Sequence, residues 1–149
     1  MPIRQQIYLR ALRTLPNIEI IFGHFLSSKV SMPVANCDRG SQQFVTVIKT
    51  EEKGSDVNIA THLVNDGYKK EIDVAVLITN DSDLKEPVRI VREELKLDVG
   101  IINPHLKPSR TLFKYASFVK KIRKGVLHSS QFPDILKDST GEFHKPSEW

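Results

Sequence analysis

Two carboxylates that bracket a hydroxyl follow directly after the most apolar strand-like stretch of this chain. Residues 73–79 read DVAVLIT, and Asn80, Asp81, Ser82 and Asp83 come next. An apolar run of this kind is typical of a parallel strand that is covered on both faces. Ligands of parallel sheets bind beyond the carboxyl ends of the strands, so these acids stand where a site is expected. Their oxygen atoms are the ligand type that Mg²⁺ and Mn²⁺ prefer.

The same residues also fit an ordinary helix start. Asp83 followed by Glu86 matches a capping box, and Asp81 or Ser82 could equally cap the helix that begins near residues 83–86. Acids in a first helical turn are favoured by the helix dipole, by about 0.3 to 1 kcal/mol each. From this stretch alone, a structural cap and a metal site both remain open.

A third acid is harder to explain by capping alone. Residues 54–68 predict a helix with Ser55 as its N-cap. On a helical wheel Asp56 falls within the apolar arc of this helix, in line with Ala60 and Leu63. A carboxylate at the rim of a core is costly unless it is capped, paired or bound to a metal.

Asp56, Asp81 and Asp83 would repel one another if the fold brought them together, and a divalent cation would remove that repulsion. Bound Mg²⁺ or Mn²⁺ keeps several water molecules for substrate phosphates, which suits hydrolysis of a phosphodiester. The hypothesis is therefore a carboxylate-bound Mg²⁺ or Mn²⁺ ion, with Asn80 and Ser82 positioned to orient ligands or substrate oxygens.

The elements that must hold these residues alternate between strand and helix. Periodicity and turn residues predict helices at 3–15, 54–68 and 84–96, strands at 18–26, 44–50, 73–79 and 98–103, a long loop at 27–42 and a basic, helix-compatible stretch at 109–127. Strands separated by helices of this length indicate an α/β fold with a mainly parallel sheet. In the tail, DSTG at 138–141 predicts a turn, and Phe143 and Trp149 are candidate anchors.

Basic residues are concentrated in the stretch 109–127. Lys120, Lys121 and Arg123 could follow an RNA backbone, with neighbouring aromatic side chains available for stacking on bases. The alternative is a C-terminal helix whose aromatic residues face the core and whose lysines face water.

Composition places the chain among ordinary globular proteins. It has 149 residues, 40% hydrophobic and 27% charged, with a net charge of +4, which permits an anionic partner without requiring one. No apolar run approaches the roughly 20 residues that a membrane helix needs. A single cysteine, Cys37, excludes an internal disulfide and fits the cytoplasm.

Residues 44–103 resemble the NYN domain family, a branch of the PIN-like metal-dependent ribonucleases. The resemblance is carried by VIKTEEKGSDVNIATHLV, DVAVLITNDSDLKEPVRIV and DVGIIN, in this order. It implies a three-layer α/β/α sandwich with a mainly parallel central sheet, which is PIN-like and Rossmann-like, and a Mg²⁺ or Mn²⁺ site that cuts RNA.

The resemblance also assigns residues. Asp56 matches the acid on the helix, Asp81 and Asp83 match the acid-Ser-acid pair, and Ser82 is the hydroxyl between them. Lys53 matches a basic residue before the helix, which is a candidate contact for substrate phosphate.

One departure from the family concerns the start of the domain. The family opens with a strand ending in an Asp, whereas residues 1–17 predict a helix and no Asp precedes Asp38. We therefore expect a domain at 1–127 that lacks the first strand and first acidic ligand, and a tail at 128–149 that packs on or trails it. A homodimer that covers the gap in the sheet is a further expectation.

Two other functions belong to different classes. A catalytically degenerate NYN domain that binds RNA or a protein partner is the main alternative, and it does not need the three acids. A dinucleotide-binding oxidoreductase is disfavoured, because no G-x-G-x-x-G turn follows any predicted strand.

Overall fold

The computed structural model describes residues 3–35 and 43–148, which belong to two compact units. Residues 21–120 form one unit, called here the sheet unit, and the segments up to residue 20 and from residue 121 onward form the terminal unit. Within the described part of the chain, no helix has the length and apolar character needed to cross a membrane. Cys37 lies outside the described residues, and the predicted domain boundary at residue 127 stays a prediction.

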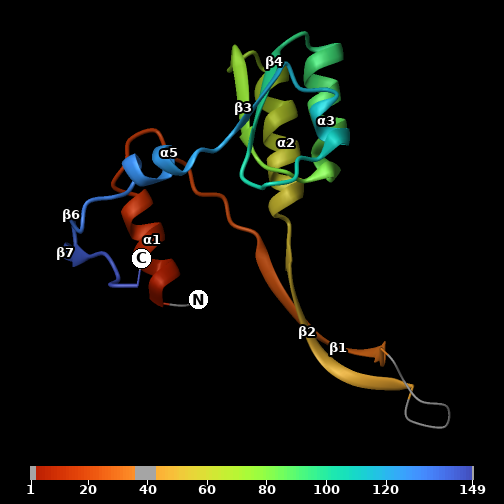
Figure 1. Cartoon of the computed structure of the whole chain (residues 1–149). Coiled ribbons are helices and arrows are strands. Elements are labelled where there is room, and N and C mark those ends of the chain that lie inside the picture. Colours follow the sequence, from red (N-terminus) through yellow and green to blue (C-terminus); the bar gives the residue numbers. More distant parts are fainter. Residues whose placement is uncertain (1–2, 36–42, 149) are drawn as a thin grey trace. The chain divides into compact units, whose positions relative to one another are not determined.

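The sheet unit contains a three-stranded sheet that confirms the predicted parallel pairing. Its strands are β3 (Val74–Ile78), β4 (Asp98–Asn103) and β5 (Phe118–Lys121), in this spatial order. β3 and β4 are parallel, with Val74 opposite Asp98 and Ile78 opposite Ile102. The chain therefore has the βα organisation of an α/β fold (Figure 1).

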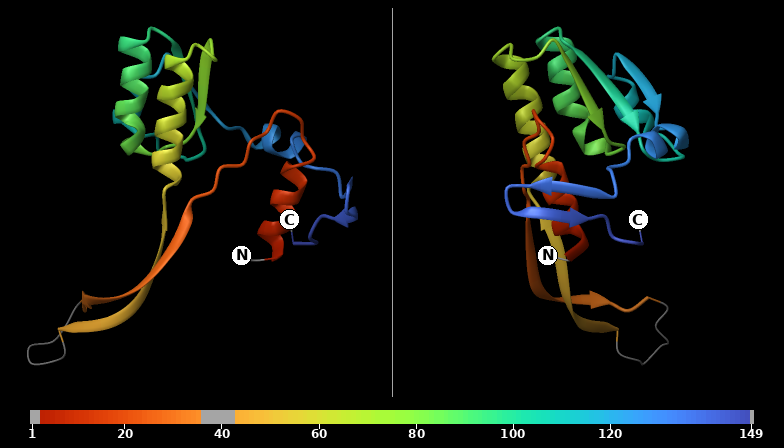
Figure 2. Two further views of the ribbon diagram at one scale, coloured as in Figure 1. Left: turned by 180° about the vertical axis from the view of Figure 1, so that it is seen from behind. Right: turned by 90° about the vertical axis from the view of Figure 1, so that its left-hand side faces the viewer.

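Helices on one side of this sheet form the core with it. α2 (Ser55–Tyr68) precedes β3, and a 3₁₀ turn (Ser82–Leu84), α3 (Lys85–Arg89) and a π-helical turn (Ile90–Glu94) connect β3 to β4. Figure 2 shows α2 and α3 on the same side of the strands. The buried core residues of this unit are Leu63, Ala75, Leu84, Val88, Val91, Val99, Ile101 and Leu112.

The expectation that β3 is covered on both faces is wrong for the described residues of this unit. Ala75 and Leu77 point to the core, but Val74, Val76 and Ile78 on the opposite face are 49%, 48% and 66% exposed. β3 is also the edge strand of its sheet. The apolar run was read correctly as a parallel strand, but its composition does not reveal how many neighbours surround it.

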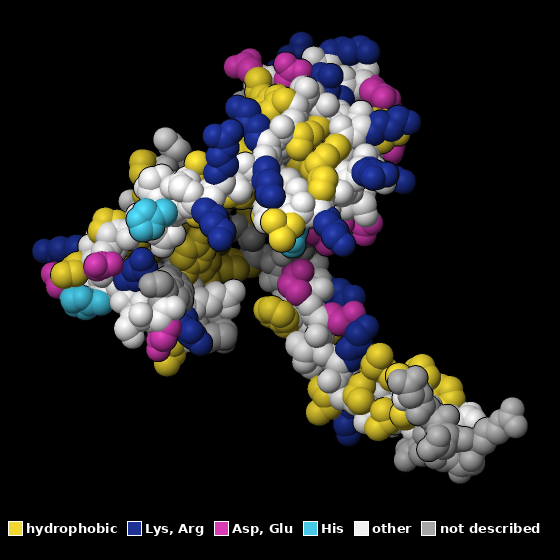
Figure 3. Space-filling model, in the orientation of Figure 1, with side chains coloured by type: hydrophobic (Ala, Val, Ile, Leu, Met, Phe, Trp, Pro, Cys, Tyr) yellow, Lys and Arg dark blue, Asp and Glu magenta, His cyan; other side chains and the backbone are white. Residues whose placement is uncertain are grey.

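A long antiparallel hairpin precedes α2. β1 (His24–Pro33) pairs with β2 (Phe44–Lys53) over its whole length, from His24 opposite Lys53 to Pro33 opposite Phe44. The strand predicted at 44–50 is confirmed, and it extends to residue 53. Figure 3 shows hydrophobic side chains, in yellow, along the hairpin. Its exposed large apolar residues include Phe25, Leu26, Met32, Phe44, Val45 and Ile48.

The first predicted strand and the following loop are corrected by this hairpin. Residues 18–23 have no regular structure, and residues 27–33, expected to be a loop, form most of β1. The reason is cross-strand pairing with β2, which supplies partners for every residue of β1. For example, Val30 lies opposite Val47, and the Ser27 and Thr50 hydroxyls are hydrogen-bonded at 2.7 Å.

The helix-compatible stretch at 109–127 does not form one helix. It consists of α4 (Arg110–Phe113), β5 and α5 (Lys124–Ser129). The break follows from pairing at Ser117, whose N–H donates to the Val99 carbonyl at 2.7 Å, and whose hydroxyl accepts from the Val99 N–H at 2.9 Å. The ring of Phe118 then lies over Gly100, in space that any Cβ at that position would occupy.

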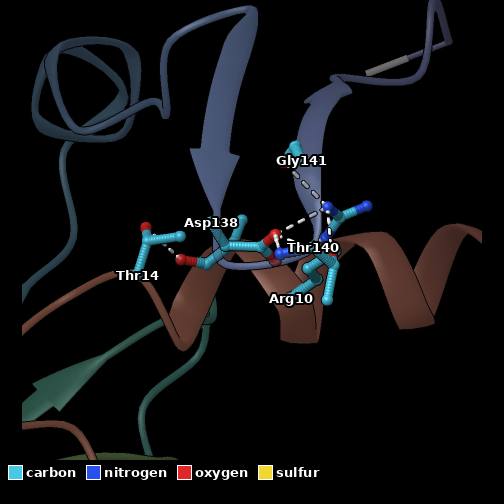
Figure 4. Close-up of polar contacts among 6 residues, drawn as sticks. Arg10, Thr14, Asp138, Thr140 and Gly141 are labelled. Atoms are coloured by element: carbon cyan, nitrogen blue, oxygen red, sulfur yellow. Dashed lines mark hydrogen bonds and ion pairs between the residues drawn. The ribbon is translucent and has the colours of Figure 1, made fainter.

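The terminal unit joins the two ends of the described chain. It contains α1 (Ile3–Leu12), which confirms the helix predicted there, and the antiparallel hairpin of β6 (Ile135–Asp138) and β7 (Gly141–His144) around the predicted turn. Phe143 is buried and therefore acts as the predicted anchor, whereas Trp149 lies outside the described residues. Arg10 of α1 binds Asp138, Thr140 and the carbonyl of Gly141 (Figure 4).

Candidate functional site

The two acids after β3 lie in a turn whose backbone is organised by side chains. The Thr79 hydroxyl accepts a hydrogen bond from the Asp81 N–H at 3.0 Å, and Oδ1 of Asp81 accepts one from the Asp83 N–H at 2.9 Å. Asp81 is thus the N-cap of the 3₁₀ turn, which confirms the capping alternative for this residue. Leu84, almost fully buried, anchors the end of this turn in the core.

The proposed capping box from Asp83 to Glu86 is wrong. The Glu86 carboxylate binds the guanidinium of Arg89, with Oε1 2.7 Å from Nη2. This hydrogen bond lowers the pKa of Glu86. No described residue donates a hydrogen bond to the Asp83 carboxylate, and Asp83 and Ser82 are exposed. The oxygen atoms of Asp83 are therefore available to an external cation.

Asp56 lies in the first turn of α2, but its surroundings differ from the expectation. Gly54 is the N-cap, with φ 99°, a conformation that glycine adopts without strain. Ser55 begins the helix and donates its hydroxyl to Glu52 at 2.8 Å, so the prediction of Ser55 as N-cap is wrong. Asp56 is exposed because it lies in the first turn of α2, whereas the buried residues of this helix, Leu63 and Gly67, lie further along it.

Two of the three predicted acids lie in one turn after β3, and the third lies in the first turn of α2. Asp81 and Asp83 share one turn. Among residues 3–35 and 43–148, however, no group of three or more His, Cys, Asp or Glu side chains is close enough to hold a metal ion. The donor chemistry of Asp81 and Asp83 fits Mg²⁺ or Mn²⁺, since Mg²⁺ is often held by one or two carboxylates together with waters and substrate phosphates.

The predicted substrate-binding residues Lys53, Ser82 and Asn80 have different surroundings. Lys53 is exposed at the end of β2, with its ammonium 3.4 Å from the Glu51 carboxylate. Ser82 is exposed within the 3₁₀ turn. Both polar atoms of the Asn80 side chain are engaged in hydrogen bonds. Nδ2 donates to the Lys107 carbonyl at 3.0 Å, and Oδ1 accepts from the Ser109 N–H at 2.7 Å.

The basic residues predicted to bind RNA are exposed on and after β5. Lys120 and Lys121 belong to that strand, and Arg123 precedes α5 as its N-cap. The Lys120 ammonium lies 5.8 Å from the centre of the Phe118 ring. The partly buried aromatic residues Phe113 and Tyr115 pack against the core, as the alternative reading of this stretch expected.

One feature near the acids was not found from the sequence. Asn103, at the end of β4, is buried, and its side chain holds both backbone groups of His105. The signal was present in the dipeptide Asn103–Pro104, which is typical of a turn. The partner of Asn80 in the following loop could not be found this way, since it is 27 residues away in sequence.

Comparisons with known proteins identify a family and a relative of this chain. The family model described as NYN domain matches residues 28–120. The protein 6-hydroxy-3-succinoylpyridine 3-monooxygenase HspA of Pseudomonas putida is 29% identical over 157 aligned positions, which cover 97% of this chain. The match covers 50% of the length of that relative.

A solved structure is similar in fold. It is a protein of unknown function from Vibrio parahaemolyticus, VPA0982, with a TM-score of 0.56 and 17% sequence identity. The match covers 83% of this chain and 63% of the other chain. At this identity, the likeness concerns the fold alone.

Proposed function

Because this chain belongs to the NYN domain family, we propose that it is a divalent-metal-dependent ribonuclease that hydrolyses RNA phosphodiester bonds. The observation that carries the proposal is the exposed carboxylate of Asp83 beside Asp81, in a turn directly after the parallel strand β3. Ligands of such sheets bind at this end of the strands. The three-layer PIN-like sandwich belongs to the same proposal.

Asp81 and Asp83 are the first ligands in this proposal, and Asp56 is the third acid. A Mg²⁺ or Mn²⁺ ion held there would activate a water molecule and stabilise the negative charge that develops on the phosphate. Asp81 has a second role, because its Oδ1 holds the Asp83 N–H and thereby orients the turn. Asp83 has no described hydrogen-bond donor to lose when it binds a cation.

The substrate-binding residues of the proposal are basic or polar. Lys120, Lys121 and Arg123 would contact RNA phosphates, and Lys53 and Ser82 would contact the strand near the acids. Asn80 contributes through the loop that its amide holds. Phosphate contacts by lysine and arginine give affinity without sequence preference.

A binding module without catalysis is the second candidate. It is favoured because no group of three or more His, Cys, Asp or Glu side chains among the described residues could hold a metal ion. A module of this kind would bind RNA or a protein partner through the same basic residues. Neutralising Asp83 would leave its binding unchanged.

A monooxygenase activity is a third candidate, and it rests on the name of the relative from Pseudomonas putida. A protein with this activity would consume O₂ and a reductant when 6-hydroxy-3-succinoylpyridine is supplied as the substrate. An oxygen electrode and analysis of the products would detect this reaction in the purified chain.

The experiment that tests the leading proposal is cleavage of a labelled, mixed-sequence RNA. Purified protein is incubated with Mn²⁺, Mg²⁺ or EDTA, and the same reactions are run with Asp83→Asn and Asp73→Asn. Asp73 immediately precedes β3 at its opposite end, so this variant controls for loss of charge and for contaminating ribonuclease. The proposal predicts metal-dependent cleavage that Asp83→Asn abolishes and Asp73→Asn keeps. Equal cleavage by both variants would contradict it.

A further inference from the structure

The loop between β4 and α4 presents exposed side chains from a firmly held backbone. Pro104, His105, Leu106 and Lys107 are all exposed, and Leu106 is 85% exposed. These side chains contribute nothing to the core. The loop follows β4 directly, at the carboxyl end of the parallel strands where the acid turn also begins.

Two asparagines hold the backbone of this loop with four hydrogen bonds. At its start, Asn103 accepts from the His105 N–H at 2.9 Å and donates to the His105 carbonyl at 3.0 Å. At its end, Asn80 donates to the Lys107 carbonyl at 3.0 Å and accepts from the Ser109 N–H at 2.7 Å. Side-chain amides satisfied in this way restrict the loop, so its exposed side chains start from a preorganised backbone.

Together with Asn80, the held loop lines a shallow, open hollow on the surface. Its volume is about 520 Å³, and its lining residues are Asn80, Pro104, His105, Leu106 and Lys107. Asn80 is also the residue before Asp81, so the hollow adjoins the acid turn through the backbone. The lining combines apolar surface, an imidazole ring and one ammonium group.

We propose that this hollow binds a single unpaired base of the RNA strand, next to the phosphodiester that is presented to Asp81 and Asp83. The inference rests on the proposed function and specifies its substrate as single-stranded at this position. A flat base needs contact on its faces, which Leu106, Pro104 and His105 can supply, and the adjoining phosphate needs a cation, which Lys107 supplies. A base held in a duplex would not be free to enter a hollow of this kind.

Asn80 acts in this proposal as a positioning residue. Its amide connects the acid turn to the far end of the loop, so the hollow and the acids are held by one side chain. Replacing it with alanine would leave the Ser109 N–H and the Lys107 carbonyl without this partner. The loop would then lose its preorganisation while Leu106 itself is retained.

The test measures equilibrium binding rather than cleavage. Fluorescence anisotropy follows a labelled, unstructured RNA of about ten nucleotides and a matched RNA with abasic sites, both in EDTA and with Asp83→Asn as the parent protein. Leu106→Ala and Asn80→Ala are compared with Val126→Ala. Val126 is an exposed apolar residue of the terminal unit, at 56% exposure, outside the proposed hollow.

We expect Leu106→Ala to weaken binding of the intact RNA by about fivefold or more, with a smaller loss for Asn80→Ala and none for Val126→Ala. The abasic RNA should bind more weakly to the parent and should not distinguish Leu106→Ala from it. Equal binding of intact RNA by the parent and Leu106→Ala would overturn the inference. So would an equal loss on both RNAs, or no RNA binding at all.

These outcomes are separate from those of the cleavage experiment. If RNA is bound through Leu106 but is not cut by the unmodified protein, the ribonuclease proposal fails and the base-binding hollow stands. If RNA is cut in a metal-dependent way and Leu106→Ala binds normally, the hollow fails and the ribonuclease stands.

Discussion

The guanidinium of Arg10 and the carboxylate of Asp138 form a two-point ion pair between residues that are 128 positions apart (Figure 4). Nε lies 2.6 Å from Oδ2, and Nη2 lies 2.8 Å from Oδ1. The same guanidinium lies 4.1 Å from the centre of the Phe143 ring. Helix α1 and the β6–β7 hairpin are thereby connected within the terminal unit.

This ion pair makes the stability of the terminal unit depend on pH. The hydrogen bond from Arg10 holds the pKa of Asp138 well below its usual value of 3.8, with a further contribution from Thr140. A depressed folded-state pKa stabilises the fold above the usual pKa, and this contribution is lost as the pH falls through the range below it. We expect Asp138→Asn to melt at a lower temperature than the unmodified protein at pH 7.

Thermal melts at a series of pH values would measure this dependence. The difference in melting temperature between the two proteins should be constant down to about pH 5 and should shrink below about pH 4. Asp134→Asn is the matched control, because Asp134 has no described ion pair. A difference that stays the same at pH 3 would show that Asp138 does not act through its charge.

The contact between Gly100 and Phe118 predicts a cost for a single added methyl group. A Cβ at position 100 would overlap the aromatic ring, so Gly100→Ala should destabilise the sheet unit by about 1–3 kcal/mol. Denaturant unfolding would measure the change. Gly125→Ala is the control, since nothing lies within 4 Å of a Cβ at that position. In a Phe118→Ala background the cost of Gly100→Ala should largely vanish, and an unchanged cost would exclude the ring as its cause.

Variants of Asp81 and Asp83, compared without metal, separate the structural role of the Asp81 cap from metal binding. Asp81→Ala removes the acceptor of the Asp83 N–H and should cost about 0.5–2 kcal/mol without any added metal, whereas Asp81→Asn keeps an acceptor and should cost less. Asp83→Asn should change stability in EDTA by no more than about 0.3–1 kcal/mol, the contribution of the helix dipole, because no described residue donates to its carboxylate. Chemical unfolding in EDTA measures all three. Equal stability of Asp81→Ala and the unmodified protein would show that the cap contributes nothing.

The exposed lysines of β5 predict a change in the salt dependence of RNA binding. Each phosphate contact of a single strand contributes a slope of about −0.7 to the dependence of log K on log salt concentration. Lys121→Ala should therefore make the slope less steep by about 0.7 if Lys121 contacts one phosphate, and Lys137→Ala of β6 should not change it. Identical slopes for the two variants would remove Lys121 from the binding surface.

Local patterns were sufficient to predict the elements around the candidate site. The apolar run at 73–79 and the strand at 98–103 form the parallel pair, and periodicity is sufficient to predict the presence of α1 and α2. The acid turn was also found, because a polar cluster at the end of an apolar strand is a local signal.

The errors concern features decided by residues far apart in sequence. Residues 27–33 form a strand because β2 pairs with them, and their own composition resembles that of a loop. The stretch 109–127 is divided because Ser117 pairs with Val99 and Phe118 packs on Gly100. A helical wheel puts Asp56 on the same face as the buried Leu63, but it gives no position along the helix axis, and Asp56 is exposed in the first turn of α2.

The most direct test of the candidate site is Mn²⁺ binding to the metal-free protein, measured by the loss of the electron paramagnetic resonance signal of free Mn²⁺. The unmodified protein and Asp73→Asn should bind one ion with equal affinity. Asp83→Asn should bind at least about tenfold more weakly, since loss of even an indirect partner of a metal ligand costs 10- to 100-fold. Equal Mn²⁺ binding by the unmodified protein and Asp83→Asn, or no binding by either, would contradict a metal site in the turn after β3.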